Sequence, residues 1–229
     1  MPKEYGYGEH SMSVDISVLI VSYNTWHLLD KCLTSILAET RCTHEIIVVD
    51  NASTDGSASM VRRRYPDVMV IENERNVGFA VANNQASQLA QGRYLFCLNP
   101  DTIILSGAID QLVEFMDLHP TVGVCGPRNV NAKMEISRSC YPFPTVRGSF
   151  LGNMCHTPLR PLVKGYHRHR SKRALPSGDQ IQDVDAVRGC SLLIRTDLYR
   201  RLGGMDEGFF LYFEEMDLCY RVKQAHYSV

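Results

Sequence analysis

Short apolar runs alternate with helical patterns over the first half of the chain. Between the runs, apolar residues recur at three- and four-residue spacing, as they do from Leu28 to Leu37, which is typical of one face of a helix. A second helix is expected to open at Asp55-Gly56-Ser57 and to end at Pro66. The runs are too short for buried helices and predict strands at 16–21, 45–49, 68–71 and 94–98, with another beginning at 122–125.

The next two helices have recognisable stripes and end signals. One begins near Phe79, and Gly92 is well placed as its C-terminal cap. Ser106 is expected to cap the other helix. The residues expected to face inward are Ala82, Ala86, Leu89 and Ala90 in the first helix and Ile109, Leu112, Val113 and Met116 in the second.

This order of elements predicts an α/β fold. Parallel neighbouring strands need crossover connections, which the helices supply. We therefore expect a Rossmann-like three-layer α/β/α sandwich with a mainly parallel central sheet. Residues 1–15 are expected to be a tail and 16–229 one domain.

The second half of the chain differs, because the hydrophobic period dissolves between residues 126 and 183. We interpret 126–183 as a long irregular excursion. Its segment 160–173 is strongly basic, which suits either a solvated loop or contact with an anionic surface. Regular structure is expected to resume at Val184, with a strand at 191–194 and a short helix at 198–202.

Composition narrows the class of protein. A chain of 229 residues with 45% apolar content can bury a sizeable core, and a net charge of −1 provides no general attraction to nucleic acid. The eight cysteines include no C-x-x-C pair and several lie in apolar segments, so we expect reduced, buried thiols. The N-terminal stretch lacks a signal-peptide core, and no apolar window approaches about 20 residues. These features predict a cytoplasmic protein with at most peripheral membrane contact.

Two acidic clusters lie far apart in the sequence, at Asn99-Pro100-Asp101 and at 214–217. The first follows an apolar strand, where open α/β sheets place their chemistry. In the second, Glu215 precedes Leu218, Cys219 and Val222 by three, four and seven residues, and so lies at the head of the inward stripe of a helix. A fold that joins the clusters would combine a metal ligand with a base.

Two features near the second acidic cluster are interpreted as structural rather than catalytic. Asp217 and Arg221, four residues apart, are expected to form a structural ion pair. His226 is expected to be a surface histidine in the same helix as Glu215.

A series of motifs between residues 16 and about 225 resembles the family 2 glycosyltransferases with the GT-A fold, and among them the rhamnosyltransferase-like members. Each motif is weak alone, and their order is specific. They are Val21-Ser22-Tyr23-Asn24, Val48 to Ser57, Asn73 to Ala80 with Asn83-Asn84, Leu98-Asn99-Pro100-Asp101, Gly203 to Glu207 and Tyr212 to Arg221.

The resemblance implies a nucleoside-diphosphate-sugar site on the loops after the strands. Asp101 would bind Mg²⁺ or Mn²⁺, and Glu215 would be the catalytic base. Two departures from the family pattern stand out: Asn99 replaces the first of two aspartates around one residue, and Glu215 replaces an aspartate. The residues assigned to the donor are Ser22, Asn24, Asp50, Asn51, Asn76, Gly78, Asn83 and Asn99.

Several of these assignments have a structural alternative. Asp50-Asn51 and the Asn76 to Gly78 loop are also typical of turns. Asn83 lies on an inward helical stripe, where a buried structural amide is nearly as plausible as a ligand contact.

The resulting hypothesis is an inverting glycosyltransferase that uses a UDP- or dTDP-sugar, and analogy with the rhamnosyltransferase-like members indicates dTDP-rhamnose. Its acceptor would be a glycan or lipid-linked hydroxyl in cell-surface polysaccharide synthesis, and nucleic acid is not an expected partner. Segment 160–173 would supply the peripheral membrane contact. Relatives usually continue beyond the position of Val229, so we expect a C-terminal truncation.

Two alternatives from other classes remain open. A catalytically inactive nucleotide-binding fragment would bind without turnover. A sugar-phosphate nucleotidyltransferase would need a glycine-rich basic signature after the first strand, which 21–26 lacks. The sequence supports a dehydrogenase even less, because no G-x-G-x-x-G motif follows any expected strand.

Overall fold

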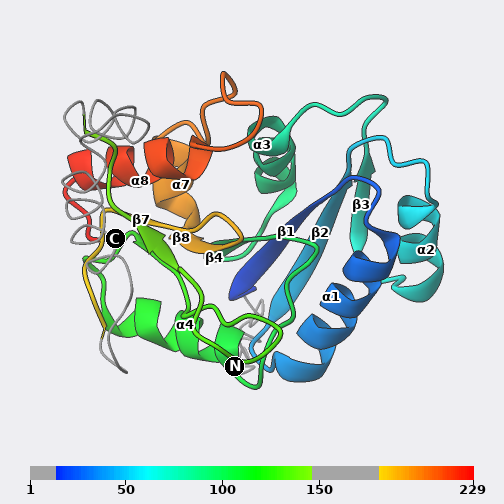
Figure 1. Cartoon of the computed structure of the whole chain (residues 1–229), viewed down its shortest axis with the longest axis horizontal. Helices are drawn as coiled ribbons and strands as arrows, with labels where there is room; N and C mark the ends of the chain where they lie inside the picture. The colour runs from blue at the N-terminus through cyan, green and yellow to red at the C-terminus, as the bar shows by residue number, and fades with distance from the viewer. Residues whose placement is uncertain (1–13, 146–180) are drawn as a thin grey trace, which may run out of the picture.

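The expected strands lie side by side in one sheet. A computed structural model describes residues 14–145 and 181–229 and contains a six-stranded sheet of order β3-β2-β1-β4-β8-β5, together with a two-stranded sheet of β6 and β7 (Figure 1). The strands are β1 (Ile16–Ser22), β2 (His44–Asp50), β3 (Met69–Glu72), β4 (Tyr94–Leu98), β5 (Val124–Cys125), β6 (Cys140–Tyr141), β7 (Ala186–Val187) and β8 (Ser191–Arg195). The helices are α1 (Trp26–Glu39), α2 (Ser57–Arg64), α3 (Phe79–Leu89), α4 (Ala108–Leu118), α7 (Thr196–Arg201) and α8 (Glu214–Gln224).

The sheet is parallel except at one strand. β1 pairs in parallel with both β2 and β4, and β2 pairs in parallel with β3. β8 runs antiparallel between β4 and β5. The expectation of a mainly parallel sheet is confirmed.

Each face of the sheet is covered by its own set of helices. One apolar cluster joins α1, α2 and α4 to β-strand residues such as Val18 and Phe96. The other joins α3, α7 and α8 to alternate residues of the same strands, such as Leu19 and Leu95. Figure 1 shows the three layers that result. Because both faces are buried, the central strands are continuously apolar, which is why their sequences show no alternation.

Three local expectations about helix ends are wrong. Leu89, expected to face inward, is the last residue of α3 and is 45% exposed. Gly92 is not the helix cap, which is Ala90. Ser106 does not cap α4 either, because Gly107 occupies that position in a left-handed conformation with φ of 67°.

The region after β5 is less irregular than its sequence indicates. Cys140–Tyr141 forms β6 and pairs antiparallel with Ala186–Val187, so part of the 126–183 excursion is ordered against the domain. The basic segment 160–173 lies outside the described residues, as does most of the 1–15 tail. No helix among residues 14–145 and 181–229 is long and apolar enough to cross a membrane.

The expectation of buried thiols is confirmed for five of the seven cysteines that the structure describes. No disulfide joins any two of the seven described cysteines; five of the seven are buried, and Cys42 and Cys190 are partly exposed. Burial raises the pKa of the Cys97 thiol to about 12, which leaves it protonated and unreactive. The role of Cys97 is therefore packing within the core.

Gly92 generates a test of how closely the connection between α3 and β4 packs against the start of β1. A Cβ atom at Gly92 would lie 2.5 Å from the Ser17 backbone nitrogen. We expect Gly92→Ala to lower the free energy of unfolding by about 1–3 kcal/mol, because the backbone must shift to admit the methyl group. Urea unfolding measures this change. Gly189→Ala is the matched control, because its methyl group would meet no atom closer than 3.4 Å; equal losses in the two variants would contradict the explanation.

Candidate active site

The parallel strands end together at one edge of the sheet. Ser22, the last residue of β1, is paired with Asp50, the last residue of β2. Leu98, at the end of β4, is paired with Ile20 of β1. The strand order reverses between β1 and β4, because the chain leaves β1 toward β2 on one side and later returns as β4 on the other. Open α/β sheets bind ligands at such a point.

Asn24 ties the loops after β1 and β2 together. Its side-chain oxygen accepts a hydrogen bond of 2.8 Å from the Thr54 backbone nitrogen, and its own backbone nitrogen donates to Ser53 Oγ. Its φ of 54° is left-handed, a conformation that asparagine tolerates. An open pocket of about 480 Å³ lies beside this tie, lined by residues 24–28 and Asp55. Asn24 thus shapes a pocket wall through contacts within the chain.

Asp50 carries a carboxylate oxygen that has no protein partner. The side chain is 3% exposed, and Oδ2 accepts a hydrogen bond of 2.8 Å from the Ser53 backbone nitrogen. Oδ1 is buried and accepts no hydrogen bond from the described part of the chain. Buried polar atoms normally have partners, so this oxygen is suited to a ligand donor such as a nucleobase N–H or a ribose hydroxyl.

The side chains of Asn51 and Ser22 form hydrogen bonds with other residues of the chain. Asn51 Nδ2 donates to the Gly78 carbonyl oxygen at 3.2 Å, and its Oδ1 accepts from Asn73 Nδ2 at 2.8 Å. Ser22 is fully buried and its hydroxyl lies 2.9 Å from Thr25 Oγ1. These contacts hold the loops after β1 and β3 at the edge of the sheet.

The loop after β3 is closely packed against the segment that precedes α8. Asn76 Oδ1 accepts a hydrogen bond from the Gly78 backbone nitrogen, and Gly78 has a left-handed φ of 89°. A Cβ atom at Gly78 would lie 2.6 Å from the Phe210 carbonyl oxygen, which accepts a hydrogen bond of 2.9 Å from the Phe79 backbone nitrogen. Glycine is required here by both the conformation and the close approach.

Asn83 is fully buried on α3. Its Nδ2 donates to the Phe79 carbonyl oxygen at 2.9 Å. Its Oδ1 is buried and, like Asp50 Oδ1, has no partner among the residues described. One half of the amide is therefore structural, and the other half could still accept a hydrogen bond.

The structure brings the two acidic clusters to one turn, formed by Arg188, Gly189 and Cys190. The Asn99 backbone nitrogen donates to the Cys190 carbonyl oxygen at 3.0 Å, and the charge of Asp101 adds to the burial that raises the pKa of the Cys190 thiol. On the other cluster, Glu215 Cβ lies 3.4 Å from the position that a Gly189 Cβ would take. The Asn99–Asp101 segment and Glu215 thus approach the same turn.

Glu215 is half-buried at the first turn of α8. Burial raises the pKa of its carboxyl group, while backbone hydrogen bonds at the helix start and the charge of Arg188 lower it. A raised pKa makes a carboxylate a stronger base, provided that it is ionised at the working pH.

Two other expectations for this helix are confirmed. The ion pair of Asp217 with Arg221 is present, with Oδ2 and Nη2 2.7 Å apart, and His226 is exposed, although it lies just beyond the helix.

Glu214 is a residue that the sequence reasoning missed. It is 4% exposed, its Oε2 has no partner among the described residues, and burial raises the pKa of its carboxyl group to about 6. The signal was available, because Glu214 precedes Leu218 by four residues and so shares the inward face of α8. Two acidic groups therefore begin this helix on its buried side.

A metal ion would have few protein ligands at this edge. No group of three or more His, Cys, Asp or Glu side chains suited to a metal occurs within residues 14–145 and 181–229. Asp101 is an exposed carboxylate just beyond β4, with the Asn99 amide two residues before it. This donor set fits a hard cation that keeps several waters and takes its remaining ligands from a diphosphate.

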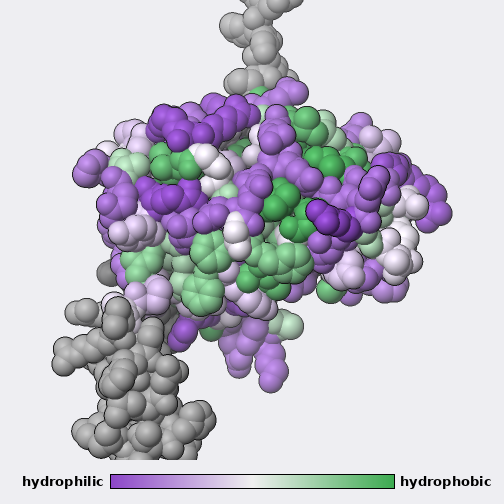
Figure 2. Space-filling view, turned by 90° about the horizontal axis from the view of Figure 1, so that it is seen from above, coloured by the Kyte–Doolittle hydropathy of each residue, from purple (hydrophilic) through white to green (hydrophobic). Residues whose placement is uncertain are grey.

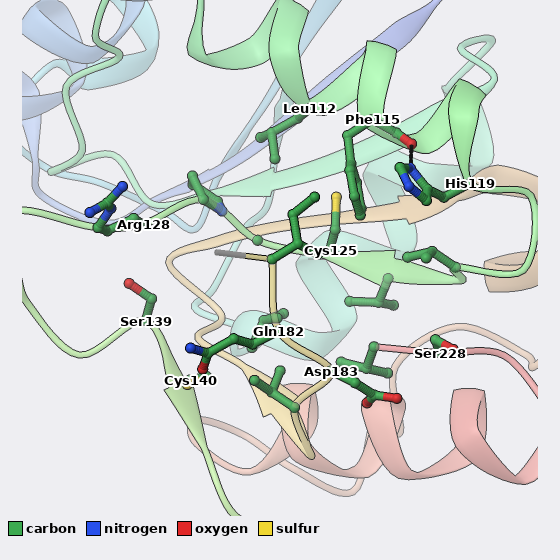
Figure 3. Close-up of a pocket in the computed structure, with 18 of the residues that line it drawn as sticks. Leu112, Phe115, His119, Cys125, Arg128, Ser139, Cys140, Gln182, Asp183 and Ser228 are labelled. Atoms are coloured by element: carbon green, nitrogen blue, oxygen red, sulfur yellow. Dashed lines mark hydrogen bonds between the residues drawn. The ribbon is translucent and has the colours of Figure 1, made fainter. Parts of the chain in front are cut away.

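A larger cavity lies elsewhere and contains none of the predicted site residues. It has a volume of about 710 Å³ and is lined by α4, β5, β6 and residues 181–184 (Figure 3). His119 stacks on Phe115 at its wall and is bonded through Nδ1 to the Phe115 carbonyl oxygen. Its lining is dominated by apolar side chains, without the carboxylates of the strand ends.

Glu214 generates a test that requires no ligand. Its carboxyl pKa is raised from an ordinary value near 4.5 to about 6, so the folded protein keeps a proton that the unfolded chain has lost. Stability should therefore fall as the pH rises from 4.5 to 6, and Glu214→Gln should lack this fall. Between pH 4.5 and pH 6, the unfolding free energy of the variant minus that of wild type should therefore increase by up to about 2 kcal/mol. Urea unfolding at several pH values measures the difference, with exposed Glu114→Gln as the control; a difference that does not vary with pH would contradict the burial of Glu214.

Comparison with known proteins agrees with this geometry. A family model described as glycosyl transferase family 2 matches residues 17–195. The chain is 28% identical over 225 residues to an N-acetylglucosaminyl-diphospho-decaprenol L-rhamnosyltransferase of Mycobacterium tuberculosis, covering 92% of this chain and 71% of the relative. It is 22% identical to a low-salt glycan biosynthesis hexosyltransferase of Haloferax volcanii, covering 96% of this chain and 66% of that protein.

Solved structures share the fold. A mannosyltransferase from Pyrobaculum calidifontis, solved with GDP-Man and Mn²⁺, superposes with a TM-score of 0.63 at 22% identity, covering 93% of this chain and 53% of that one. S. aureus TarS in complex with UDP gives a TM-score of 0.63 at 15% identity, covering 91% and 55%. The architecture is GT-A. On the family match, which spans most of its length, the chain belongs to glycosyl transferase family 2.

Proposed function

We propose that this chain contains the donor site and catalytic base of an inverting, metal-dependent glycosyltransferase. It would transfer a sugar from a UDP- or dTDP-sugar to a hydroxyl of a glycan or lipid-linked acceptor in cell-surface polysaccharide synthesis. The observation that carries the proposal is the approach of the Asn99–Asp101 segment and Glu215 to the same Arg188–Cys190 turn. The names of the mycobacterial rhamnosyltransferase and the haloarchaeal hexosyltransferase support the reaction class, and dTDP-rhamnose is a donor to test first.

The donor would lie along the ends of β1, β2 and β4. The free Asp50 Oδ1 would accept a hydrogen bond from the base or ribose, and Tyr23, half exposed after β1, offers a ring for stacking. Of the other assigned residues, Ser22, Asn24, Asn51, Asn76 and Gly78 would act by holding the loops, and Asn83 and Asn99 would add polar contacts.

Asp101 would hold Mg²⁺ or Mn²⁺, assisted by the Asn99 amide oxygen. When bound, such an ion neutralises charge on the departing nucleoside diphosphate. The Mn²⁺ in the mannosyltransferase complex supports this assignment.

Glu215 would remove the proton from the acceptor hydroxyl. The hydroxyl oxygen would form a bond to the anomeric carbon as the bond from that carbon to the diphosphate oxygen breaks, and the electron pair would leave with the nucleoside diphosphate. One displacement inverts the anomeric centre and needs one base. Residues 16–229 would form the catalytic domain, with the 126–183 excursion on the acceptor side and segment 160–173 as a peripheral membrane contact.

Calorimetric titration with UDP and dTDP, each with and without Mn²⁺, tests the donor site. We expect metal-dependent binding of one nucleotide, about 10- to 100-fold weaker in Asp50→Asn, because a hydrogen bond to a charged group is lost. Asp101→Asn should remove the Mn²⁺ dependence. If neither nucleotide binds with metal present, this chain lacks a working donor site.

Replacement of the base separates transfer from binding. Glu215→Gln should abolish sugar transfer, because the amide cannot take a proton, while the affinity for the nucleotide is retained. In wild type, the rate should fall on the acid side of the Glu215 pKa, which burial raises. Turnover of a radiolabelled donor measures both effects. Unchanged turnover in the variant would refute the assignment, and binding without turnover in wild type would favour the inactive nucleotide-binding fragment.

A further inference from the structure

Four consecutive large apolar side chains are exposed immediately before α8. The aromatic loop, defined as Phe210, Leu211, Tyr212 and Phe213, is 59%, 52%, 70% and 55% exposed along its length. A run of this kind is unusual on a folded surface unless it binds something. Figure 1 shows the connection from α7 to α8 rising beside α3, and Figure 2, seen from that side, shows hydrophobic residues gathered among polar ones.

The aromatic loop is anchored at both ends. At its start, the Phe210 carbonyl oxygen accepts a hydrogen bond from the Phe79 backbone nitrogen, next to Gly78. At its end, the Phe213 carbonyl oxygen accepts a hydrogen bond from the Asp217 backbone nitrogen in α8. Upstream, Asn84 bonds to both the nitrogen and the oxygen of Met205, each at 2.9 Å. The exposed side chains therefore extend from a fixed segment of backbone.

A buried hydrogen-bond network supports the upstream anchor. Tyr199 is almost fully buried, and its hydroxyl donates to Asn84 Oδ1 at 2.6 Å. A Cβ atom at Gly204 would lie 2.4 Å from the same oxygen, so the turn fits closely around this amide. Helices α3 and α7 together thus set the course of the chain that leads into the aromatic loop.

The backbone of the loop is strained at its two most C-terminal residues. Tyr212 and Phe213 have φ values of 71° and 74°, in the left-handed region that bulky residues rarely adopt. This conformation is unfavourable for residues that carry a Cβ atom, and such strain gathers at functional sites. Glycine at either position would relieve it, yet the chain has aromatic rings there.

The surroundings point to the chemistry of the ligand. The aromatic loop leads directly into Glu214 and Glu215, so whatever covers it lies beside the base. Asp206 and Glu207, both exposed, precede it. This acidic neighbourhood disfavours an anionic membrane and suits hydroxyl groups, which donate hydrogen bonds to carboxylates. Sugar rings combine an apolar C–H face with a rim of hydroxyls, and aromatic rings present a large apolar face.

We propose that the aromatic loop is the acceptor subsite, where Tyr212 and Phe213 pack against the apolar face of a saccharide ring and direct its hydroxyl toward Glu215. This inference rests on the proposed glycosyltransferase function and specifies the acceptor as a cyclic sugar held by stacking. The donor nucleotide does not depend on these rings, because its proposed contacts lie at the ends of β1, β2 and β4.

Saturation-transfer NMR tests the subsite without turnover. Wild type with Mn²⁺ and the nucleotide that binds would be mixed with the methyl glycosides of glucose, N-acetylglucosamine, galactose and rhamnose. We expect saturation of the ring C–H protons of at least one glycoside, reduced at least fivefold in the double variant Tyr212→Gly and Phe213→Gly. Glycine suits the left-handed backbone, so the double variant should keep its fold and its nucleotide affinity. Tyr212→Phe should retain the signal, and Leu118→Ala, which alters a 69% exposed side chain on α4, is the control for nonspecific apolar contact.

Each other result overturns a defined statement. Nucleotide binding with no saturated glycoside, or equal saturation in wild type and the double variant, would overturn the acceptor subsite alone. Absence of nucleotide binding in the same sample would overturn the proposed function. Vesicles of anionic phospholipid that bind wild type but not the double variant, with glycoside saturation unchanged, would overturn the subsite and assign the aromatic loop to a membrane surface.

Discussion

The parallel pairing of β1 with both β2 and β4 is the constraint on which the rest of this structure depends. β1 is buried on both faces, and its register with its neighbours sets where every loop begins. A shift of one residue would turn each apolar side chain to the opposite face. Because the strands end at the same edge of the sheet, Asp50 at the end of β2 and the Asn99–Asp101 segment after β4 lie at that edge, although about 50 residues of sequence separate them.

Polar side chains convert that edge into a defined site. Asn24, Asn51 and Asn84 each bridge segments that are distant in sequence, using both the donor and the acceptor sides of the residue. A buried amide is stabilising only when its partners are present, so these bridges hold the loops in a narrow range of positions. Among the residues that the structure describes, buried oxygens of Asp50, Asn83 and Glu214 have no hydrogen-bond partner, so these side chains can accept hydrogen bonds from a ligand or donate them to it.

The elements themselves were largely predictable from the sequence. Buried parallel strands are short continuous apolar runs, and helices packed on one face carry stripes, so both patterns are local and readable. The wrong predictions were at helix ends. Gly92 and Ser106 are residue types that commonly cap helices, but Gly92 instead allows the backbone to pack closely against β1, and Gly107 is the N-cap residue of α4. β6 escaped notice because two residues paired with a distant strand carry no periodicity.

The sequence alone determined the α/β class, the order of elements, the family resemblance and the two acidic clusters, because each is expressed in residue types at short spacing. Only the tertiary structure decided that the Arg188–Cys190 turn joins those clusters, that Glu214 is buried beside Glu215, and that Asn51 and Asn24 are occupied by the protein itself. The reason is physical. Burial and hydrogen-bond partners depend on which segments pack together across long stretches of chain, and neither spacing nor composition records that choice.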